Sequence, residues 1–501
     1  MSSAVQALLS SQGPMLSADL AKRLEATGVT AVNARKLIQR ASGAVSRLSG
    51  VRFPRNEQFL YIGDDFGSSK FWKSLLKAFD ARSSVYGWAA NALIARSGAI
   101  PSYQFNIISG APLRMKGQVS AESIRQRFEQ IRFLSSTTLK DLGPCFLINP
   151  AVDDQLPDNP FSALRARLLA EEILLDALRD WVRKLGLGSY NRVEIRSSQL
   201  TPSFGQFCWD LVAPSYIPPF ARFSGDGKLQ PGFIVCDAVL GVELSKPQVG
   251  YFIRKVSTLR QNRKIRPFLA MLIAEHFSQE AFSALKQNGI VATQPSALFG
   301  QTVGRALRTL LSTLSNAAAA AAANPEVVSI LFKDLSSIEG AAGNLRGPLF
   351  ELVVGHFAKR QGSYIELSKR VRDSEDGREA EIDVFANSTD LVTAYECRGH
   401  VNASVQLADV ERWLTRTLPI LRAHMLASTE LRAKKLKGEF WTTSTFAPDA
   451  EAHLRERQSQ LTKYEISWLD GPAIREMLSR TRESRLREIL DEHFFHHPLS
   501  E

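Results

Sequence analysis

The amino-acid sequence predicts a multidomain α/β protein. Its 501 residues exceed the length that one hydrophobic core usually supports. Two stretches, residues 160–310 and 326–480, alternate strand-like segments with helical segments, which is typical of a mixed or parallel sheet covered by helices. The N-terminal stretch differs, because three helical segments are followed by a hairpin pattern. We therefore expect four parts, at residues 1–66, 67–155, 156–315 and 326–501.

Composition narrows the classes of function. The chain has a formal net charge of +11 and a pI of about 9.5, which favours a polyanionic partner such as nucleic acid. The four cysteines form no CxxC pair, so a zinc ribbon is not expected, and a reducing compartment suits them. The first residues lack a signal-peptide pattern, and no apolar run reaches the ~18 residues of a membrane helix. We expect a cytoplasmic protein that does not contact a membrane. The alanine run at 317–323, followed by Asn-Pro, is expected to close a helix.

Helix signals bound the N-terminal segments. Ser17 and Thr30 are suitable N-cap residues, and Gly28 is suitable for ending the helix between them. The stretch 51–62 has the pattern of two short strands around a polar turn at 55–57. This order of elements resembles a winged helix-turn-helix domain.

That resemblance implies a DNA-binding surface, in which a recognition helix enters the major groove and the wing contacts phosphates. The residues that would make these contacts are Arg35, Lys36 and Arg40 on the recognition helix, and Arg52 and Arg55 near the wing. The alternative is a small helical domain that mediates protein contacts. Residues 67–155 are predicted to be mainly helical, as a second winged-helix-like unit or as a helical linker domain.

The middle block begins with a long helical segment over 162–184, followed by strand patterns. Residues 267–275 form a continuous apolar run, which is typical of a strand buried on both faces. The C-terminal block has a similar order of helices and strands. The two blocks are therefore predicted to be related by pattern, without recognisable sequence identity.

Two acidic residues occur on neighbouring predicted strands of the C-terminal block. Asp383 lies in the strand at 381–386 and Glu396 in the strand at 391–399, where alternation places Arg398 on the same face as Glu396. Two carboxylates on adjacent strands can hold a hard divalent cation over a phosphate, because Mg²⁺ prefers carboxylate oxygens and water.

The motifs Glu381-Ile-Asp383-Val and Tyr395-Glu396-Cys-Arg398-Gly resemble the PD-(D/E)xK nuclease superfamily, which has the restriction-endonuclease-like fold. The resemblance covers about 130 residues, including the helices and strands that flank the motifs. It implies that Asp383 and Glu396 bind Mg²⁺ or Mn²⁺. It also implies that Glu351, on the preceding helix, assists them, and that Arg398 takes the third catalytic position. Gln406, on the following helix, is a further candidate.

The sequence departs from this family at Arg398, where lysine is usual. Lysine can change its protonation state, whereas a guanidinium group stays charged and can only donate hydrogen bonds. Arg398 could stabilise charge on the phosphate, Lys369 could approach from the neighbouring strand, or the domain could bind DNA without cutting it. His400 is interpreted as a surface or phosphate contact, and the histidine-rich stretch at 493–497 as a frayed helix end.

On the same template, Asp210 and Asp237 of the middle block occupy the positions of the acidic pair, with Glu171 or Glu172 as the helical acid. The base is missing, because Val239 stands in its place. We expect a nuclease-like scaffold without activity, with a generic α/β domain as the alternative.

A basic segment at 254–266, which includes Arg263 and Lys264, follows this middle pair. It is expected to contact nucleic-acid phosphates or to form a solvated face.

These features predict a metal-dependent DNA endonuclease that hydrolyses phosphodiester bonds. By analogy with the family, its setting is restriction or anti-phage defence. DNA is the expected partner, and other defence subunits or a second copy of the chain remain open. The competing interpretation is a non-catalytic DNA-binding, regulatory or scaffold protein with an inactive nuclease fold.

Overall fold

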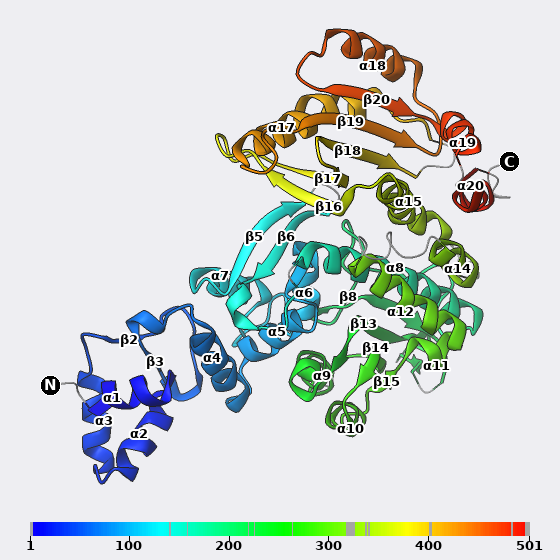
Figure 1. Cartoon of the computed structure of the whole chain (residues 1–501). Helices are drawn as coiled ribbons and strands as arrows, with labels where there is room; N and C mark the ends of the chain where they lie inside the picture. Colours follow the sequence, from blue (N-terminus) through cyan, green and yellow to red (C-terminus); the bar gives the residue numbers. More distant parts are fainter. Residues whose placement is uncertain are drawn as a thin grey trace. The chain divides into compact units, whose positions relative to one another are not determined.

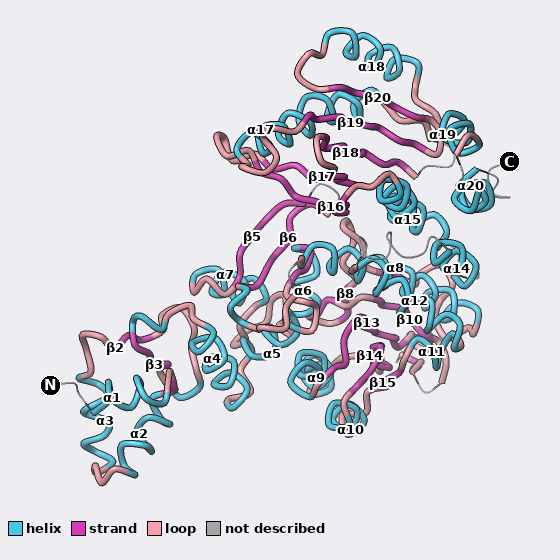
Figure 2. Tube along the Cα trace, in the orientation of Figure 1, coloured by secondary structure: helices cyan, strands magenta, loops and turns pink. Residues whose placement is uncertain are grey.

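The computed structural model describes residues 4–139, 142–157, 159–218, 220–224, 226–262, 264–316, 326–335, 338, 341–399, 403–481 and 484–495. It is a multidomain α/β protein, about half helical, with two mixed five-stranded sheets and several small sheets (Figures 1 and 2). The chain divides into two compact units: unit 1, Met1–Leu164 with Ala177–Leu298, and unit 2, Arg165–Asp176 with Phe299–Glu501. The alanine run, Arg263 and His400 lie outside the described residues. No described helix is long and apolar enough to cross a membrane.

Unit 1 begins with three helices and an antiparallel sheet in the order β1-β3-β2. The predicted strand at 51–54 is wrong, and the strand that pairs with β3 is Val45–Arg47. Pro54 cannot donate to a strand ladder, and Arg55 and Asn56 adopt left-handed φ angles of 58° and 57°. The elements are α1 (Ala4–Gln12), β1 (Met15–Leu16), α2 (Ser17–Ala26), α3 (Ala31–Arg40), β2 (Val45–Arg47) and β3 (Phe59–Ile62).

Arg47 attaches the sheet to the end of α3. Its guanidinium group donates to the carbonyl oxygens of Ile38 at 2.8 Å, Gln39 at 3.1 Å and Ala41 at 3.1 Å. The last carbonyls of a helix lack partners within the helix, so a cation at this place satisfies them.

The next part of unit 1 repeats this order with a second three-stranded sheet. Its strand order, β4-β6-β5, matches β1-β3-β2, with the last strand of the chain segment in the middle. In both parts a helix precedes the first strand and two helices separate it from the hairpin. The elements are α4 (Ser69–Ala81), α5 (Val85–Ile94), β4 (Ala99–Pro101), α6 (Phe105–Ile108), α7 (Ala121–Gln130), β5 (Leu134–Leu139) and β6 (Gly143–Ile148).

The middle five-stranded sheet has the order β15-β14-β13-β10-β7. The apolar run predicted to be buried on both faces is β14, whose central residues are all buried. The main elements are α8 (Pro160–Lys184), β7 (Glu194–Ile195), β10 (Leu211–Ser215), β13 (Gly232–Leu244), α9 (Lys246–Arg260), β14 (Phe268–Phe277), α10 (Gln279–Gln287) and β15 (Val291–Thr293). Two small ribbons and the helix α11 follow in this part of the chain: β8 (Ser203–Phe204), β9 (Phe207–Cys208), β11 (Arg222–Phe223), β12 (Leu229–Gln230) and α11 (Pro295–Phe299). The next helix, α12 (Gln301–Ser315), belongs to unit 2.

The C-terminal sheet has the order β16-β17-β18-β19-β20. Its core lies between the sheet and the long helical segment that follows β18, where Phe385, Trp413, Leu418 and Phe440 are buried. The elements are α14 (Glu326–Leu335), α15 (Ala341–Arg360), β16 (Tyr364–Arg372), β17 (Glu379–Asn387), β18 (Leu391–Arg398), α16 (Leu407–Arg412), a π-helical segment (Trp413–Thr417), α17 (Leu418–Ala427), β19 (Lys435–Thr442), α18 (Pro448–Gln460), β20 (Glu465–Leu469), α19 (Gly471–Ser479), α20 (Ser484–Leu490) and a last π-helical turn (Asp491–Phe495).

The two five-stranded sheets share one connectivity. In each, the first three strands along the chain are antiparallel neighbours, and the last two are added in parallel. In each, a long helix precedes the first strand, and helices separate the third, fourth and fifth strands. This agreement is the repetition of order that the sequence predicts.

Candidate active site

Asp383 and Glu396 face each other on neighbouring antiparallel strands. Val384 of β17 pairs with Tyr395 of β18, so the same register, continued by one residue, sets Asp383 opposite Glu396. Both side chains are nearly buried, with 6% and 3% of their surface exposed. The structure therefore brings the two predicted carboxylates together.

Arg398 lies against both carboxylates. Its Nη2 is 2.6 Å from Oε1 of Glu396, and its Nη1 is 3.4 Å from Oδ2 of Asp383. The backbone N–H of Cys397 also donates to Oδ2 of Asp383, at 2.8 Å. The guanidinium charge and this N–H together offset the repulsion between two buried negative charges.

The thiol of Cys397 lies within electrostatic range of three carboxylates. Burial raises the pKa of Cys397 well above its ordinary value. Negative charges raise it further, in decreasing order from Asp383, Glu351 and Glu396, while Arg398 acts in the opposite direction. Glu351 of α15, the predicted helical acid, is therefore within electrostatic range of Cys397, the residue between Glu396 and Arg398.

Gly399 lets β18 approach α15 closely. A Cβ atom at Gly399 would lie 2.6 Å from the carbonyl oxygen of Arg346, closer than real Cβ atoms come to other atoms. Only glycine therefore fits without a shift of the helix. This contact fixes the helix that carries Glu351 against the end of the strand that carries Glu396 and Arg398.

Two further predicted candidates do not join the pair. Nζ of Lys369 is 2.6 Å from Glu366 and 4.0 Å from the ring centroid of Phe385, and among the described residues it forms no ion pair with the two acids. Gln406 is exposed, and its amide donates to the carbonyl oxygen of Ser404 at 2.9 Å.

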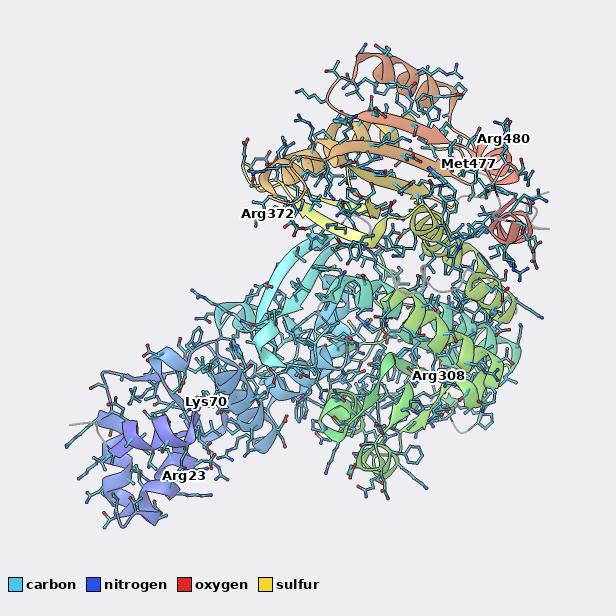
Figure 3. All side chains as sticks on the ribbon, viewed as in Figure 1. Arg23, Lys70, Arg308, Arg372, Met477 and Arg480 are labelled. Atoms are coloured by element: carbon cyan, nitrogen blue, oxygen red, sulfur yellow. The ribbon has the colours of Figure 1, made fainter. Side chains whose placement is uncertain are left out.

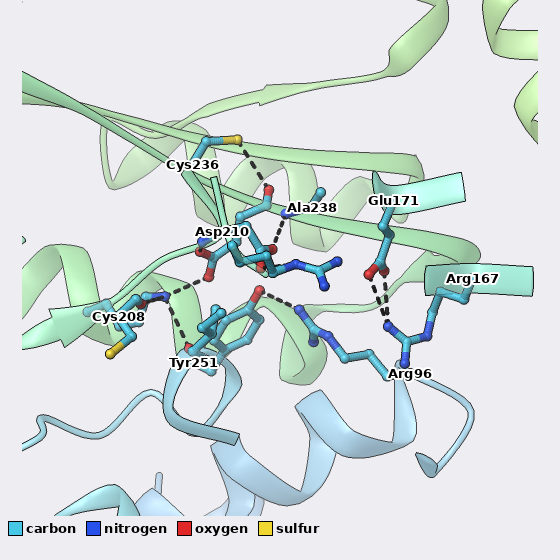
Figure 4. A network of polar contacts seen from close by, with 12 residues as sticks. Arg96, Arg167, Glu171, Cys208, Asp210, Cys236, Ala238 and Tyr251 are labelled. Carbon is cyan, nitrogen blue, oxygen red and sulfur yellow. Dashed lines mark hydrogen bonds and ion pairs between the residues drawn. The ribbon is translucent and has the colours of Figure 1, made fainter. Parts of the chain in front are cut away.

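The middle sheet repeats the geometry of the acidic pair. Leu211 of β10 pairs with Cys236 of β13. The same register, continued by one residue, sets Asp210 opposite Asp237. The N–H of Ala238 donates to Oδ2 of Asp210 at 2.8 Å (Figure 4). In the C-terminal pair the N–H of Cys397 donates to Oδ2 of Asp383 at the same distance. The two acidic pairs therefore occupy the same position in topology and register.

Lys255 of α9 neutralises the middle pair. Its Nζ lies 2.6 Å from Oδ2 of Asp237 and donates to the carbonyl oxygens of Ile107, at 3.1 Å, and Cys208, at 2.8 Å. These contacts use the three donors of an ammonium group. Both side chains of the ion pair are 0% exposed, so neither water nor substrate reaches them in this structure. Burial lowers the pKa of Lys255, and the charge of Asp237 opposes that shift.

The other carboxylates of the middle template are also paired. Arg196 is the residue that follows β7, and its Nε is 2.6 Å from Oδ1 of Asp210. In α8, Arg167 lies 3.1 Å from Glu171, and both are buried. Beside the acidic pair itself, Lys255 and Arg196 supply the positive charge that the missing base at Val239 does not.

The basic segment at 254–266 was predicted to contact phosphates or to form a solvated face, and neither prediction holds for Lys255, which is buried in the core. A signal for its burial exists. Tyr251 lies four residues before Lys255, Phe252 three residues before it, and Leu259 four residues after it. Side chains at these spacings share one face of a helix, so Lys255 lies on the apolar face of α9. In the same segment, Arg254 donates to Gln118 and lies over an indole ring, whereas Lys264 is exposed in the loop before β14.

The predicted DNA-contacting residues near the N-terminus are exposed. They are Arg35, Lys36 and Arg40 on α3, and Arg52 and Arg55 in the loop between β2 and β3. The buried face of α3 is narrow and consists of Ala34 and Ile38, whereas Val32 and Leu37, which the helical spacing groups with them, are exposed. The outer face of α3 is therefore open along its length.

Among the described residues, no group of three or more His, Cys, Asp or Glu side chains is arranged to hold a metal ion. Mg²⁺ needs fewer protein ligands, because it keeps several waters and uses one or two carboxylates together with substrate phosphates. Asp383 and Glu396 fit that donor set.

No family model, curated protein or solved structure matches this chain. A functional assignment therefore rests on the chemistry of the two acidic pairs.

Proposed function

We propose that the protein is a metal-dependent nuclease that hydrolyses phosphodiester bonds in DNA. The observation that carries the proposal is the opposition of Asp383 and Glu396 on adjacent strands, with Arg398 two residues further on. Support also comes from the order of elements around the pair, since a helix with Glu351 precedes it and a long helix and a core strand follow. This is the order that the resemblance to PD-(D/E)xK nucleases implies.

In this proposal, Asp383 and Glu396 hold Mg²⁺ or Mn²⁺, and Glu351 assists from α15. The metal, when bound, would lower the pKa of a bound water and neutralise charge on the phosphate. Arg398 now compensates the two acids. A divalent cation would take over that compensation, so the guanidinium group could donate to phosphate oxygens instead.

DNA engagement is assigned to the exposed cations of α3 and of the loop between β2 and β3, which would contact phosphates and base edges as in a winged helix. The net charge of +11 supports a polyanionic partner. By family analogy the setting is restriction or anti-phage defence, where further subunits or a second copy of the chain would be partners.

A cleavage assay tests the proposal. The full chain is incubated with supercoiled and linear duplex DNA, single-stranded DNA and RNA, in Mg²⁺ or Mn²⁺. Mutation of a residue that only supports a metal ligand lowers metal affinity or activity by about 10- to 100-fold. Because Asp383 and Glu396 are the proposed ligands themselves, we expect Asp383→Asn and Glu396→Gln to lower the cleavage rate by about 100-fold or more. The matched control is Asp376→Asn, which removes a carboxylate from an exposed turn. Absence of cleavage of every substrate by the wild type would contradict the proposal.

One observation favours a second function, DNA binding without cleavage. Arg398 already forms ion pairs with both acids, and the equivalent acids of the middle sheet are fully neutralised. Comparing the wild type with Arg398→Ala separates the two functions. If the protein is a nuclease, the wild type cleaves DNA and Arg398→Ala loses that cleavage. A non-cutting protein shows a salt-sensitive gel shift with duplex DNA and no cleavage in either form.

A further inference from the structure

A cavity of about 430 Å³ lies in unit 2. Its lining residues come from the end of α17 and the starts of β19 and β20, and these three elements are labelled in Figure 1. The register of β18 and β19 gives the distance between this cavity and the acidic pair. Lys435, which lines the cavity, is paired with the first residue of β18. Glu396 is paired with Phe440, which lies five residues after Lys435 in β19. At about 3.3 Å per residue, the cavity is roughly 16 Å along the strands from the acidic pair. It is therefore separate from the candidate active site.

Positive charge dominates the lining of this cavity. The cations are Arg422, Arg432, Lys434, Lys435 and Lys463, and the one carboxylate is Glu465. Lys434 is occupied, because its Nζ donates to Oδ1 of Asn387 and to the carbonyl oxygen of Ser388, both at 2.7 Å.

The other four cations have no hydrogen bond or ion pair from their side chains to any described residue, and Glu465 forms no ion pair with them. Like charges around one cavity raise its positive potential, and a bound polyanion relieves their repulsion. The charge distribution therefore selects a ligand with several negative charges.

The remaining lining is apolar and aromatic. Met425, Leu431 and Leu436 are buried at the cavity, and Tyr464 is half-buried beside them. Burial raises the pKa of Tyr464, against the charges of Arg457 and Arg422, so its ring stays neutral near pH 7. Small-molecule sites of roughly 300–1,000 Å³ combine such an apolar wall with a few charged groups.

We propose that this cavity binds a nucleoside polyphosphate. The phosphates lie among Arg422, Arg432, Lys435 and Lys463, and the base lies against the apolar wall and Tyr464. A site of this volume has the size of a small-molecule site, whereas duplex DNA contacts a protein over a much larger surface. The proposal does not depend on the nuclease assignment.

Calorimetric titration of the full chain with ATP, GTP, CTP and UTP tests it, with inorganic tripolyphosphate as the probe without a base. EDTA is present, so that a metal held by the acidic pair cannot bind the phosphates. We expect one site per chain for at least one nucleotide, weaker binding of tripolyphosphate, and a loss of about tenfold or more in Arg422→Gln/Lys463→Gln.

The matched control is Arg455→Gln/Arg480→Gln, which removes the same charge from exposed arginines of unit 2 (Arg480 is labelled in Figure 3). It should bind the nucleotide like the wild type. The proposal is overturned if no nucleotide binds at about 1 mM, if the control loses as much affinity as the cavity variant, or if tripolyphosphate binds as tightly as the nucleotides. It is also overturned if the cavity variant loses affinity for a short DNA duplex alone.

Discussion

Lys255 and Arg398 stand beside equivalent carboxylates, but their exposure differs. Lys255 and Asp237 expose no surface, whereas 20% of the Arg398 side chain is exposed. A completely buried ion pair cannot exchange its partner without opening the core, because an uncompensated charge there is costly. A partly exposed guanidinium group can release its carboxylates to a metal ion and donate to a phosphate instead. The two acidic pairs therefore differ mainly in the exposure of the cation beside them.

The Lys255 substitution to methionine tests the structural role of the middle pair. Removing one partner of a buried ion pair leaves the other charge unpaired, so Lys255→Met should destabilise unit 1 by about 3–5 kcal/mol in denaturant unfolding. The exposed Lys264→Met is the control and should change stability by about 0.5 kcal/mol or less. Adding Asp237→Leu to Lys255→Met should recover part of the loss. Equal effects of the two lysine variants would show that the pair is not structural.

The buried thiol of Cys236 predicts a pH effect. Burial raises its pKa well above the ordinary value, and the charges of Asp237 and Asp210 raise it further. Above about pH 8.5 the unfolded thiol loses its proton while the folded one keeps it, so stability should fall as pH rises. One such proton contributes at most about 1.4 kcal/mol per pH unit. Cys236→Ala should have a shallower decline in unfolding free energy between pH 8 and 10, and an unchanged decline would refute the effect.

At this scale the sequence indicates acids better than cations. Asp383 and Glu396 are placed by local strand alternation and a short turn, which can be predicted without tertiary structure. The pairing of Lys255 with Asp237 joins a helix to a strand, and Arg196 reaches Asp210 from the residue that follows β7. Such pairings depend on how the elements pack.

Among the elements, α3 carries the most direct test of DNA binding. Its outer face presents Arg35, Lys36 and Arg40 to solvent. Replacing all three with alanine should weaken duplex binding and lower the slope of log affinity against log salt by about 2–3, since each phosphate contact contributes about 0.9.

The control for the α3 variant is Arg125→Ala in α7, the equivalent helix of the second small sheet, where Arg125 is already paired with Glu122 and Glu129. Fluorescence anisotropy at several salt concentrations measures both variants. An unchanged slope in the α3 variant would assign this helix to another partner.

Long elements were predictable and short ones were not. The predicted segments overlap closely with helix α8 and with the strands β14, β17 and β18. In each of these strands consecutive residues are buried, so length and a nearly continuous apolar run, not alternation, made them predictable. The first strand of the hairpin was predicted at 51–54 but lies at Val45–Arg47. Val51 and Phe53 are buried and alternate with polar residues as in a strand, although they lie in a loop. Burial without strand pairing gives the same local sequence signal.

Over the whole molecule, the same architectures occur in pairs. Two small sheets share the order of first, third and second strand, and two five-stranded sheets share connectivity and the register of an acidic pair. The second large sheet was predictable as a pattern from the alternation of its segments. The equivalence of the acidic pairs was predictable as well, but the neutralisation of one pair follows only from the packed core.

The central claim is that the C-terminal acidic pair binds a divalent metal. Calorimetric titration of the full chain with Mn²⁺ tests it most directly, because it needs neither a substrate nor turnover. The account predicts one Mn²⁺ site per wild-type chain, lost in Asp383→Asn and retained in Asp376→Asn. Absence of Mn²⁺ binding by the wild type, or one site retained in Asp383→Asn, would contradict it.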